Sequence, residues 1–444
     1  MHTLIRLSLS LSLGLGVALT GSAGAIGAVE PRPVGFVLTV ESGAHDRNNT
    51  LVQVELPTEQ IPTLILDATK GLTKPASITI VEEGDDPTPR EAIPAQMDRV
   101  GSADGPARIT FILPGETKAK TTRRFRWEGE IDSRPKASSW HFQDSAEGHI
   151  ELLHGEAPVI RYNTSPIDDP DGKVQGQARD AYIHPAYTPS GTIITGDYSR
   201  DSHPHHRGFF LAHTSTQIGA LRPDFWNLHR DNSRIRFDRI GEVVAGPVTA
   251  RFTAFHRWIV KQEGQDREVL QERWDVEAYD LPGSPYWLFD LTSTQQATGE
   301  PLTLTPSRYG GMAYRGPDSF APPAVLDVLT SEGLDRAQGD QKPTRWVDLT
   351  GPIAEGSNDY AGAAMLDHPA NVNHPTAARI HPTRLPFFCY TPNHDDPVVI
   401  DSETPTVFRY RILVHDGRPE ADRNEAAWRD FAEPPQVTVE SIGR

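Results

Sequence analysis

The chain has 444 residues, a formal net charge of −17 and a single cysteine, Cys389. Its 36 glycines and 38 prolines disfavour helical bundles and coiled coils, and suit short strands joined by turns. The acidic excess gives no electrostatic reason to bind nucleic acid or an anionic membrane surface. A lone cysteine also excludes an intramolecular disulfide and any Cys-x-x-Cys zinc or redox motif.

The first 28 residues are predicted to be a secretory signal peptide. A basic start at Arg6 precedes the apolar stretch "LSLSLSLGLGVALTG", and small residues follow, with an exit after Ala25 or Ala28. No apolar run after residue 30 approaches the length of about 18 residues that suggests a membrane span. We therefore expect a secreted or periplasmic protein without a membrane span.

Short strand-like segments dominate residues 34–130. Five of them alternate apolar and polar residues and are bounded by clusters of Pro, Gly and Asp. They cover residues 34–41, 51–56, 77–81, 108–113 and 123–128. This number of strands is enough for a small β-sandwich. The polar stretch 129–148 is predicted to be a boundary or crossing segment.

Longer strands follow, and they predict a second and larger unit over residues 140–444. Residues 248–260, 268–279, 286–294 and 407–415 alternate with period two, which is typical of an antiparallel sheet with one packed and one solvated face. One short helix is predicted over 423–431, with Asp422 as its cap and Pro434 and Pro435 ending it. The predicted fold is all-β, with an N-terminal β-sandwich, a larger antiparallel β-sandwich and one C-terminal helix.

The histidines indicate a candidate site. Five of the 17 histidines lie between residues 203 and 229, in a stretch rich in loop-forming residues. Residues 199–236 also hold six arginines against three aspartates, so this stretch is locally basic in an acidic chain. One interpretation is a pocket for a sugar or an acidic sugar. In it, His and Arg donate hydrogen bonds, a His or Tyr acts as acid or base, and Trp226 offers a stacking face.

Two other interpretations of the same stretch stay open. Imidazole and carboxylate groups suit Zn, Fe, Cu or Ni, so the cofactor is left open, with a divalent metal as one option. The candidate metal ligands are Asp201, His203, His205 and His206, together with His213 or His229. Alternatively, the stretch is a structural loop whose histidines satisfy backbone groups and pair with Asp201 and Asp224.

Two further polar clusters could contribute to a site. "PSRYGGMAYRGPD" (306–318) supplies Arg308, Tyr309, Tyr314 and Arg315, which are types that bind anionic or hydroxylated ligands. "LDHPANVNHP" (366–375) supplies His368 and Asn371, although turn structure explains much of this segment. Cys389 lies in an apolar run and is predicted to be a buried, inert thiol. The sequence has no G-x-S-x-G, Walker or Rossmann motif.

The sequence resembles a secreted bacterial family labelled "methane oxygenase PmoA" or PmoA-like, formally a domain of unknown function. The resemblance rests first on "YIHPAYTPSGTIIT", "DSHPHHRGFFLAH" and "DFW" (182–226). It extends to "GAHDRNNTLVQVELP" (43–57), "RYGGMAYRGPD" (308–318), "RWVDLTG" (345–351), "AMLDHPANVNHP" (364–375) and "FRYRILVHDG" with "WRDFAEPP" (408–435). It implies a larger sandwich similar to galactose-mutarotase and polysaccharide-lyase supersandwiches, which bind sugars. It does not imply methane oxidation, which belongs to integral membrane proteins.

The leading hypothesis is a secreted, carbohydrate-active β-sandwich protein that acts on or binds a glycan or small sugar. The predicted catalytic residues are His203, His205, His206, Arg207, Tyr309 and Tyr314, and the predicted substrate-binding residues are His213, Asp224, Trp226, His229, Arg308, Arg315, His368 and Asn371. As an enzyme it would be a lyase or epimerase, or a hydrolase using Asp201 and Asp224. The alternatives are a metal-dependent oxygenase or hydrolase, and a non-catalytic glycan-binding module.

Overall fold

The computed structural model is built almost entirely from β-strands. It describes residues 35–56, 75–84, 92–100, 105–127, 138–145, 147–168, 176–199, 203–321, 326–354, 356–383 and 385–442. The predicted signal peptide (1–28) and Asp201 lie outside these residues. Within them there is one α-helix, so the predicted all-β class with a C-terminal helix is confirmed. No helix in this part of the chain is long and apolar enough to cross a bilayer.

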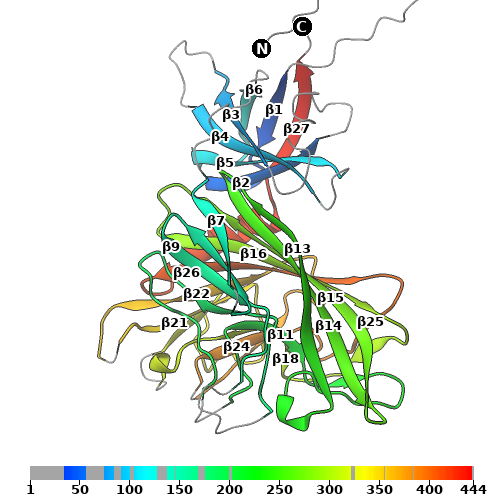
Figure 1. Ribbon diagram of the computed structural model, residues 1–444. Coiled ribbons are helices and arrows are strands. Elements are labelled where there is room, and N and C mark those ends of the chain that lie inside the picture. Colours follow the sequence, from blue (N-terminus) through cyan, green and yellow to red (C-terminus); the bar gives the residue numbers. More distant parts are fainter. Residues whose placement is uncertain are drawn as a thin grey trace, which may run out of the picture.

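The first unit is a seven-stranded antiparallel sheet at one end of the molecule (Figure 1). Its strand order is β2-β5-β4-β3-β6-β1-β27. The strands are β1 (Gly35–Glu41), β2 (Arg47–Leu56), β3 (Ala76–Glu82), β4 (Ala92–Arg99), β5 (Ala107–Thr117), β6 (Thr122–Trp127) and β27 (Gln436–Ile442). Alternate side chains of these strands, such as Phe36, Ile78 and Phe111, pack into one buried core.

The last strand joins this first unit. β27 pairs antiparallel with β1 along its whole length, from Gly35 opposite Ile442 to Glu41 opposite Gln436. The predicted domain division ended the first unit at residue 130 and gave residues 436–442 to the second unit. The pairing instead places these residues in the first sheet, so this sheet takes strands from both ends of the described chain.

Two large sheets form the second unit and pack face to face. The nine-stranded sheet has the order β20-β23-β24-β18-β11-β10-β9-β8-β7, and the eight-stranded sheet has the order β13-β14-β15-β16-β26-β22-β21-β19. The strands of the first are β7 (Trp140–Ser145), β8 (His149–His154), β9 (Ala157–Asn163), β10 (Tyr182–Ala186), β11 (Phe209–His213), β18 (Gly310–Arg315), β20 (Lys342–Pro343), β23 (Ala377–Ile380) and β24 (Phe387–Thr391). Those of the second are β13 (Ser233–Ala245), β14 (Thr249–Gln262), β15 (Gln265–Tyr279), β16 (Tyr286–Ala297), β19 (Asp327–Thr330), β21 (Trp346–Pro352), β22 (Tyr360–Asp367) and β26 (Thr406–Asp416).

Smaller elements complete the second unit. A three-stranded sheet joins β12 (Thr216–Gln217), β17 (Leu302–Leu304) and β25 (Val398–Ile400). Two 3₁₀ turns, η2 (Leu228–Arg230) and η3 (Asp318–Phe320), lie in loops. Helix α2 (Ala421–Ala432) is slightly longer than predicted, and its N-cap is Glu420, so the prediction of Asp422 as the cap is wrong. Asp422 lies in the first helical turn, where a negative charge suits the helix dipole.

The core of the second unit follows the predicted alternation. Every second residue of β14 from Ala250 to Val260, including Phe252, Ala254 and Trp258, is at most 2% exposed. In the opposite sheet, Phe209 contacts Phe289 of β16 across the interior, with ring centroids 6.1 Å apart. Successive residues of a strand point to opposite faces, so Phe210 lies on the outer face of the nine-stranded sheet.

A buried carboxylate sits between the two sheets. Glu272 of β15 accepts hydrogen bonds from five side chains of β14, β15 and β16. They are His256 (3.1 Å), Trp258 (2.9 Å), Trp274 (2.7 Å), Ser293 (2.6 Å) and Gln295 (3.2 Å). The other ring nitrogen of His256 lies 2.5 Å from the Tyr162 hydroxyl, which joins the eight-stranded sheet to β9 of the nine-stranded sheet. Burial acts to raise the pKa of Glu272, but the hydrogen bonds from His256, Ser293 and Trp258 outweigh it and lower that pKa.

The two units meet through buried charges. Arg108 of β5 forms a two-pronged ion pair with Glu277 of β15, at 2.6 and 3.1 Å. Asp98 of β4 pairs with Arg251 of β14, and both are less than a tenth exposed. Paired, planar contacts of this kind fix orientation as well as adding energy. The interface therefore favours one relative placement of the two units.

Candidate functional site

The histidine loop, residues 203–207, lies against the outer face of the nine-stranded sheet. Its His206 ring stacks on Phe387 of β24, with centroids 4.3 Å apart, and makes an edge contact with Trp226 at 5.4 Å. Trp226 in turn contacts Phe210 at 4.8 Å. The loop is thus anchored on the outer-face aromatic residues of two strands.

Gly208 allows the chain to leave this loop and enter β11. Its φ is +40°, a conformation that side chains rarely adopt. A Cβ atom added there would lie 2.0 Å from the carbonyl oxygen of Ile183 in β10. Because the obstacle is backbone, it cannot swing aside as a side chain would. The glycine of the "HHRG" motif therefore has a structural reason to be glycine.

Four imidazole rings gather at the loop. Ring centroids are 4.6 Å apart for His205 and His206, 5.0 Å for His203 and His206, and 5.7 Å for His203 and His205. His381, which the sequence analysis did not select, lies 6.2 Å from His203. Burial, helped by neighbouring positive groups, lowers the pKa of His205 to about 3, that of His381 to about 4 and that of His206 well below its usual value. These three rings are therefore uncharged at neutral pH.

Two buried arginines beside the loop bond to carbonyl groups. The Arg179 guanidinium lies over the Phe210 ring and donates to the carbonyls of Phe225 (3.2 Å) and Trp226 (3.4 Å). Arg336 donates to the carbonyls of His381 and Leu385, both at 2.6 Å. Within the described ranges neither forms an ion pair with a carboxylate. Burial is the main cause that lowers the pKa of Arg336 and brings that of Arg179 to about 10, so both stay charged at neutral pH.

Part of the 306–318 segment lies next to Trp226. The Tyr309 ring lies 6.4 Å from Trp226, and its hydroxyl accepts a hydrogen bond from Arg379 at 3.0 Å. Arg308 is exposed and lies over the Tyr309 ring at 5.4 Å. Tyr309 is only partly buried. The predicted pair Arg308 and Tyr309 therefore lies beside Trp226, which in turn contacts His206.

Four more predicted residues lie at the loop, but most of them are buried and stabilise its structure. Arg207 is buried and pairs with Asp197 at 2.8 Å, while Arg315 is buried and pairs with Asp318. Asp224 accepts hydrogen bonds from its own loop, including the Asn227 backbone N–H at 2.9 Å. Trp226 is 2% exposed, so its ring is a wall and not the open stacking face that was expected.

Of three further predicted residues, one lies on the surface and two lie in the interior between the sheets. His229 is exposed on η2 and is one of the smaller causes that lower the pKa of His205. His213 and Tyr314 point into the interior, where His213 lies 5.6 Å from Trp258 and Tyr314 stacks on Phe209 at 4.8 Å. The structure does not bring these two to the histidine loop.

His368 and Asn371 lie beside helix α2. The His368 ring meets Phe431 of the helix at 4.7 Å, and Asn371 holds the backbone of Arg409 in β26. These contacts are far better suited to docking the helix than to binding a ligand at the loop. Their predicted binding role stays a prediction.

The metal interpretation gains no support from the described residues. Among these, no three His, Cys, Asp or Glu side chains are placed to hold one ion. Asp201 lies outside the described residues, so neither its predicted role as a metal ligand nor its predicted role beside Asp224 in a hydrolase is tested. Cys389 is buried as predicted, and burial raises its pKa to about 11.

Sequence reasoning missed Arg179, Arg336, Arg379, His381 and Phe387. One signal was available for His381, because it precedes a proline as His203 does. That signal alone is weak, since His368 and His374 also precede prolines and lie elsewhere. The arginines come from distant segments, and only the tertiary fold shows that they converge.

Residues 149–429 match the family described as "Family of unknown function (DUF6807)". The chain belongs to this family. Its description names neither the methane oxygenase label nor the supersandwich enzymes that the sequence resemblance implied, so both stay predictions. No curated protein matches the chain.

Two solved structures from Enterococcus faecalis are similar over 94% of this DUF6807 chain, at 10% sequence identity. One is a protein in glycosyl hydrolase family 38 (TM-score 0.38), and the other is an alpha-mannosidase from strain V583 (TM-score 0.31). The chain spans about half the length of each, 49% and 47% respectively. At these TM-scores neither likeness establishes a shared fold.

Proposed function

We propose that the DUF6807 chain is a secreted carbohydrate-active protein, and that its histidine loop binds a glycan bearing carboxylate groups. The observation that carries this proposal is the charge balance at the loop. Arg179, Arg336 and Arg308 form no ion pair with a carboxylate among the described residues, while the nearby imidazoles of His205 and His381 are uncharged at neutral pH. Among the residues that the structure describes, arginines therefore outnumber carboxylates at the loop, and a ligand carboxylate would neutralise the excess positive charge.

The partly exposed groups at the loop suit a sugar. A neutral imidazole offers one hydrogen-bond donor and one acceptor, which matches the two roles of a hydroxyl group. Tyr309 adds a partly exposed ring and a hydroxyl, and Arg308 adds a guanidinium at the rim. Sites with a few convergent polar groups beside aromatic side chains are typical of small-ligand binding.

The low pKa values favour a binding role for these histidines over proton abstraction. A general base works best when its pKa lies near the operating pH, and about 3 for His205 is far below neutrality. An anionic ligand would raise the pKa of His205 and His381, so its binding takes up protons. We therefore expect oligouronates to bind more tightly at pH 5 than at pH 7.

Calorimetry with uronate trisaccharides and their methyl esters tests the proposal. The esters keep the ring and hydroxyl pattern but remove the charge. Arg308→Gln should weaken binding of the free acids about tenfold, which corresponds to about 1.4 kcal/mol. Arg222→Gln is the matched control, because Arg222 is also exposed but bonds the carbonyls of Gly219 and Leu221. Equal binding of acids and esters would refute the proposed ligand class.

Activity is a separate question with its own assay. Incubating the same polymers with the protein and following new reducing ends, or absorbance from unsaturated uronates, distinguishes a hydrolase or lyase from a binding module. Binding that depends on Arg308 without product formation would assign the chain to the non-catalytic class.

A further inference from the structure

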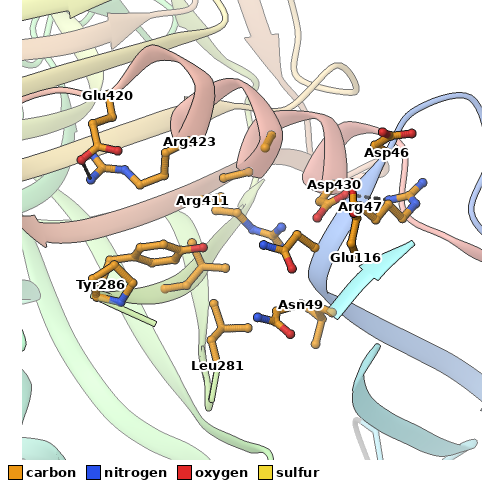
Figure 2. Close-up of a pocket in the computed structure, with 16 residues that line it drawn as sticks. Asp46, Arg47, Asn49, Glu116, Leu281, Tyr286, Arg411, Glu420, Arg423 and Asp430 are labelled. Atoms are coloured by element: carbon orange, nitrogen blue, oxygen red, sulfur yellow. Dashed lines mark hydrogen bonds and ion pairs between the residues drawn. The ribbon is translucent and has the colours of Figure 1, made fainter. Parts of the chain in front are cut away.

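A polar cavity lies beneath helix α2, and no residue of the histidine loop lines it. Figure 2 shows this α2 groove, which has a volume of about 590 Å³ and lies between the first unit, strands β16 and β26, and the helix. It is lined by Asp46, Arg47, Asn48, Asn49, Leu51, Glu116, Leu281, Pro285, Tyr286, Leu288, Arg411, Glu420, Arg423, Ala426, Ala427 and Asp430. Because both units contribute walls, the groove exists only in the assembled chain.

Small residues on one face of helix α2 leave room for the groove. Glu420, Arg423, Ala427 and Asp430 recur every three or four residues and therefore share a face. Glu420 and Arg423 stand near one end of this face and Asp430 near the other (Figure 2). Ala426 and Ala427 lie between them in the sequence and present only methyl groups. Larger residues at these two positions would fill the space.

The remaining walls combine apolar and polar groups. Leu51, Leu281, Leu288 and Tyr286 supply apolar surface, and Tyr286 is partly exposed. Asn49 adds an amide whose oxygen accepts the Gly115 backbone N–H at 2.8 Å, which leaves its NH₂ group as a donor. A ligand that fits this lining needs both an apolar face and hydroxyl groups.

Each arginine that lines the groove is paired with a carboxylate. Arg47 pairs with Asp430 at 2.8 Å, and Arg411 pairs with Asp290 at 2.7 and 2.9 Å. Arg423 lies 3.4 Å from Asp348 and 3.7 Å from Glu420. With each of these guanidinium groups already matched to a carboxylate, the lining has no positive group left over to bind an anionic ligand.

We propose that the α2 groove is a second binding site, for an uncharged sugar of one or two rings. Its volume falls within the range of roughly 300–1,000 Å³ typical of ligand pockets, which often lie at domain interfaces. The C–H face of a sugar ring would pack on Tyr286, and its hydroxyls would bond Asn49, Arg423 and Asp430. This inference does not rest on the function proposed for the histidine loop.

Saturation-transfer NMR with neutral sugars tests the second site. The probes are glucose, galactose, mannose, xylose, cellobiose, maltose and lactose, each with wild-type protein and two tryptophan variants. Ala426→Trp places a large side chain in the groove from an exposed position. Ala421→Trp is the matched control, because Ala421 is also exposed on α2 but does not line the groove. At least one sugar should bind wild type and Ala421→Trp and lose at least tenfold in affinity in Ala426→Trp.

Two results would overturn the proposal: binding of none of these sugars, or equal binding by Ala426→Trp and wild type. Glucuronate that binds the groove as tightly as glucose would refute the uncharged class. If Ala426→Trp does not fold, as judged by circular dichroism, Tyr286→Leu replaces it and should also weaken binding. Uronate binding that depends on Arg308 should persist in Ala426→Trp, so failure of one site is distinguishable from failure of the other.

Discussion

Replacing Glu272 tests whether the buried carboxylate organises the core of the second unit. Glu272→Ala removes the acceptor of five hydrogen bonds at 2.6–3.2 Å. Each buried donor left unpaired costs about 1–3 kcal/mol, and breaking a buried ionic contact costs about 3–5 kcal/mol. Some of these donors will bond other acceptors or water, so we expect the free energy of unfolding to fall by at least about 4 kcal/mol. That is a large share of the roughly 5–15 kcal/mol by which proteins are stable.

Glu272→Gln should lower the free energy of unfolding less than Glu272→Ala does. The amide keeps one acceptor oxygen but turns an NH₂ donor toward side chains that are themselves donors, so we expect a loss of about 2 kcal/mol. Glu268→Ala is the control on the same strand, since Glu268 accepts only an exposed hydrogen bond from Gln271 at 2.8 Å. Its effect should stay within about 0.5 kcal/mol.

Guanidinium unfolding followed by tryptophan fluorescence provides the measurement. Trp258 and Trp274 both donate to Glu272, so their emission reports directly on this part of the core. A Glu272→Ala protein that unfolds within about 1 kcal/mol of wild type would refute the reasoning. It would mean that the five donors are satisfied without the carboxylate.

Three further predictions concern the loop, the pH dependence of stability and the thiol. Gly208→Ala should lower the unfolding midpoint clearly more than Gly333→Ala. Both glycines have positive φ, but only at Gly208 would the added Cβ lie 2.0 Å from a backbone oxygen. Equal losses would show that this close approach does not matter. Stability should fall as the pH drops from about 6.5 toward 4, since burial holds the folded pKa of His205 at about 3 and of His213 at about 4, so the unfolded chain binds more protons in that window. Urea unfolding at pH 7, 6 and 5 measures this, and His213→Gln should reduce the slope; an unchanged slope would contradict the assignment. Cys389 should react with a thiol reagent at pH 8 only on unfolding, because the group is buried and its pKa is about 11; rapid labelling of the native protein would contradict this.

Strand alternation carried most of what the sequence predicted about the fold. The period of two in β14 and β15 placed Phe252, Trp258 and Trp274 inside, and they are buried. The same parity puts Glu272 inside, although a carboxylate in a core is unexpected until its partners on neighbouring strands are known. Strand β4 was missed because Pro94, Gln96 and Asp98 break the apolar pattern. Gln96 and Asp98 are polar because their side chains bond Thr249 and Arg251 in β14 of the second unit.

The site was predictable where its residues are close in sequence. Short spacing brought His203, His205 and His206 together, and the structure keeps them in contact. Parity within β18 could have separated Tyr314, which faces inward, from Arg315, which faces the loop. Arg179 and His381 could not be found in this way, because they are far from the loop in sequence and contacts between distant segments leave no local pattern.

The pairing of β1 with β27 has a consequence for how the protein is made. Strand β1 is synthesised about 400 residues before β27, the strand that pairs with its open edge. Until then β1 presents an open edge, which is the kind of surface that recruits other chains. Contacts of such long sequence separation also slow folding. Completion of the first sheet is thereby tied to synthesis of residues 436–442, and a chain interrupted before them would leave the edge of β1 exposed.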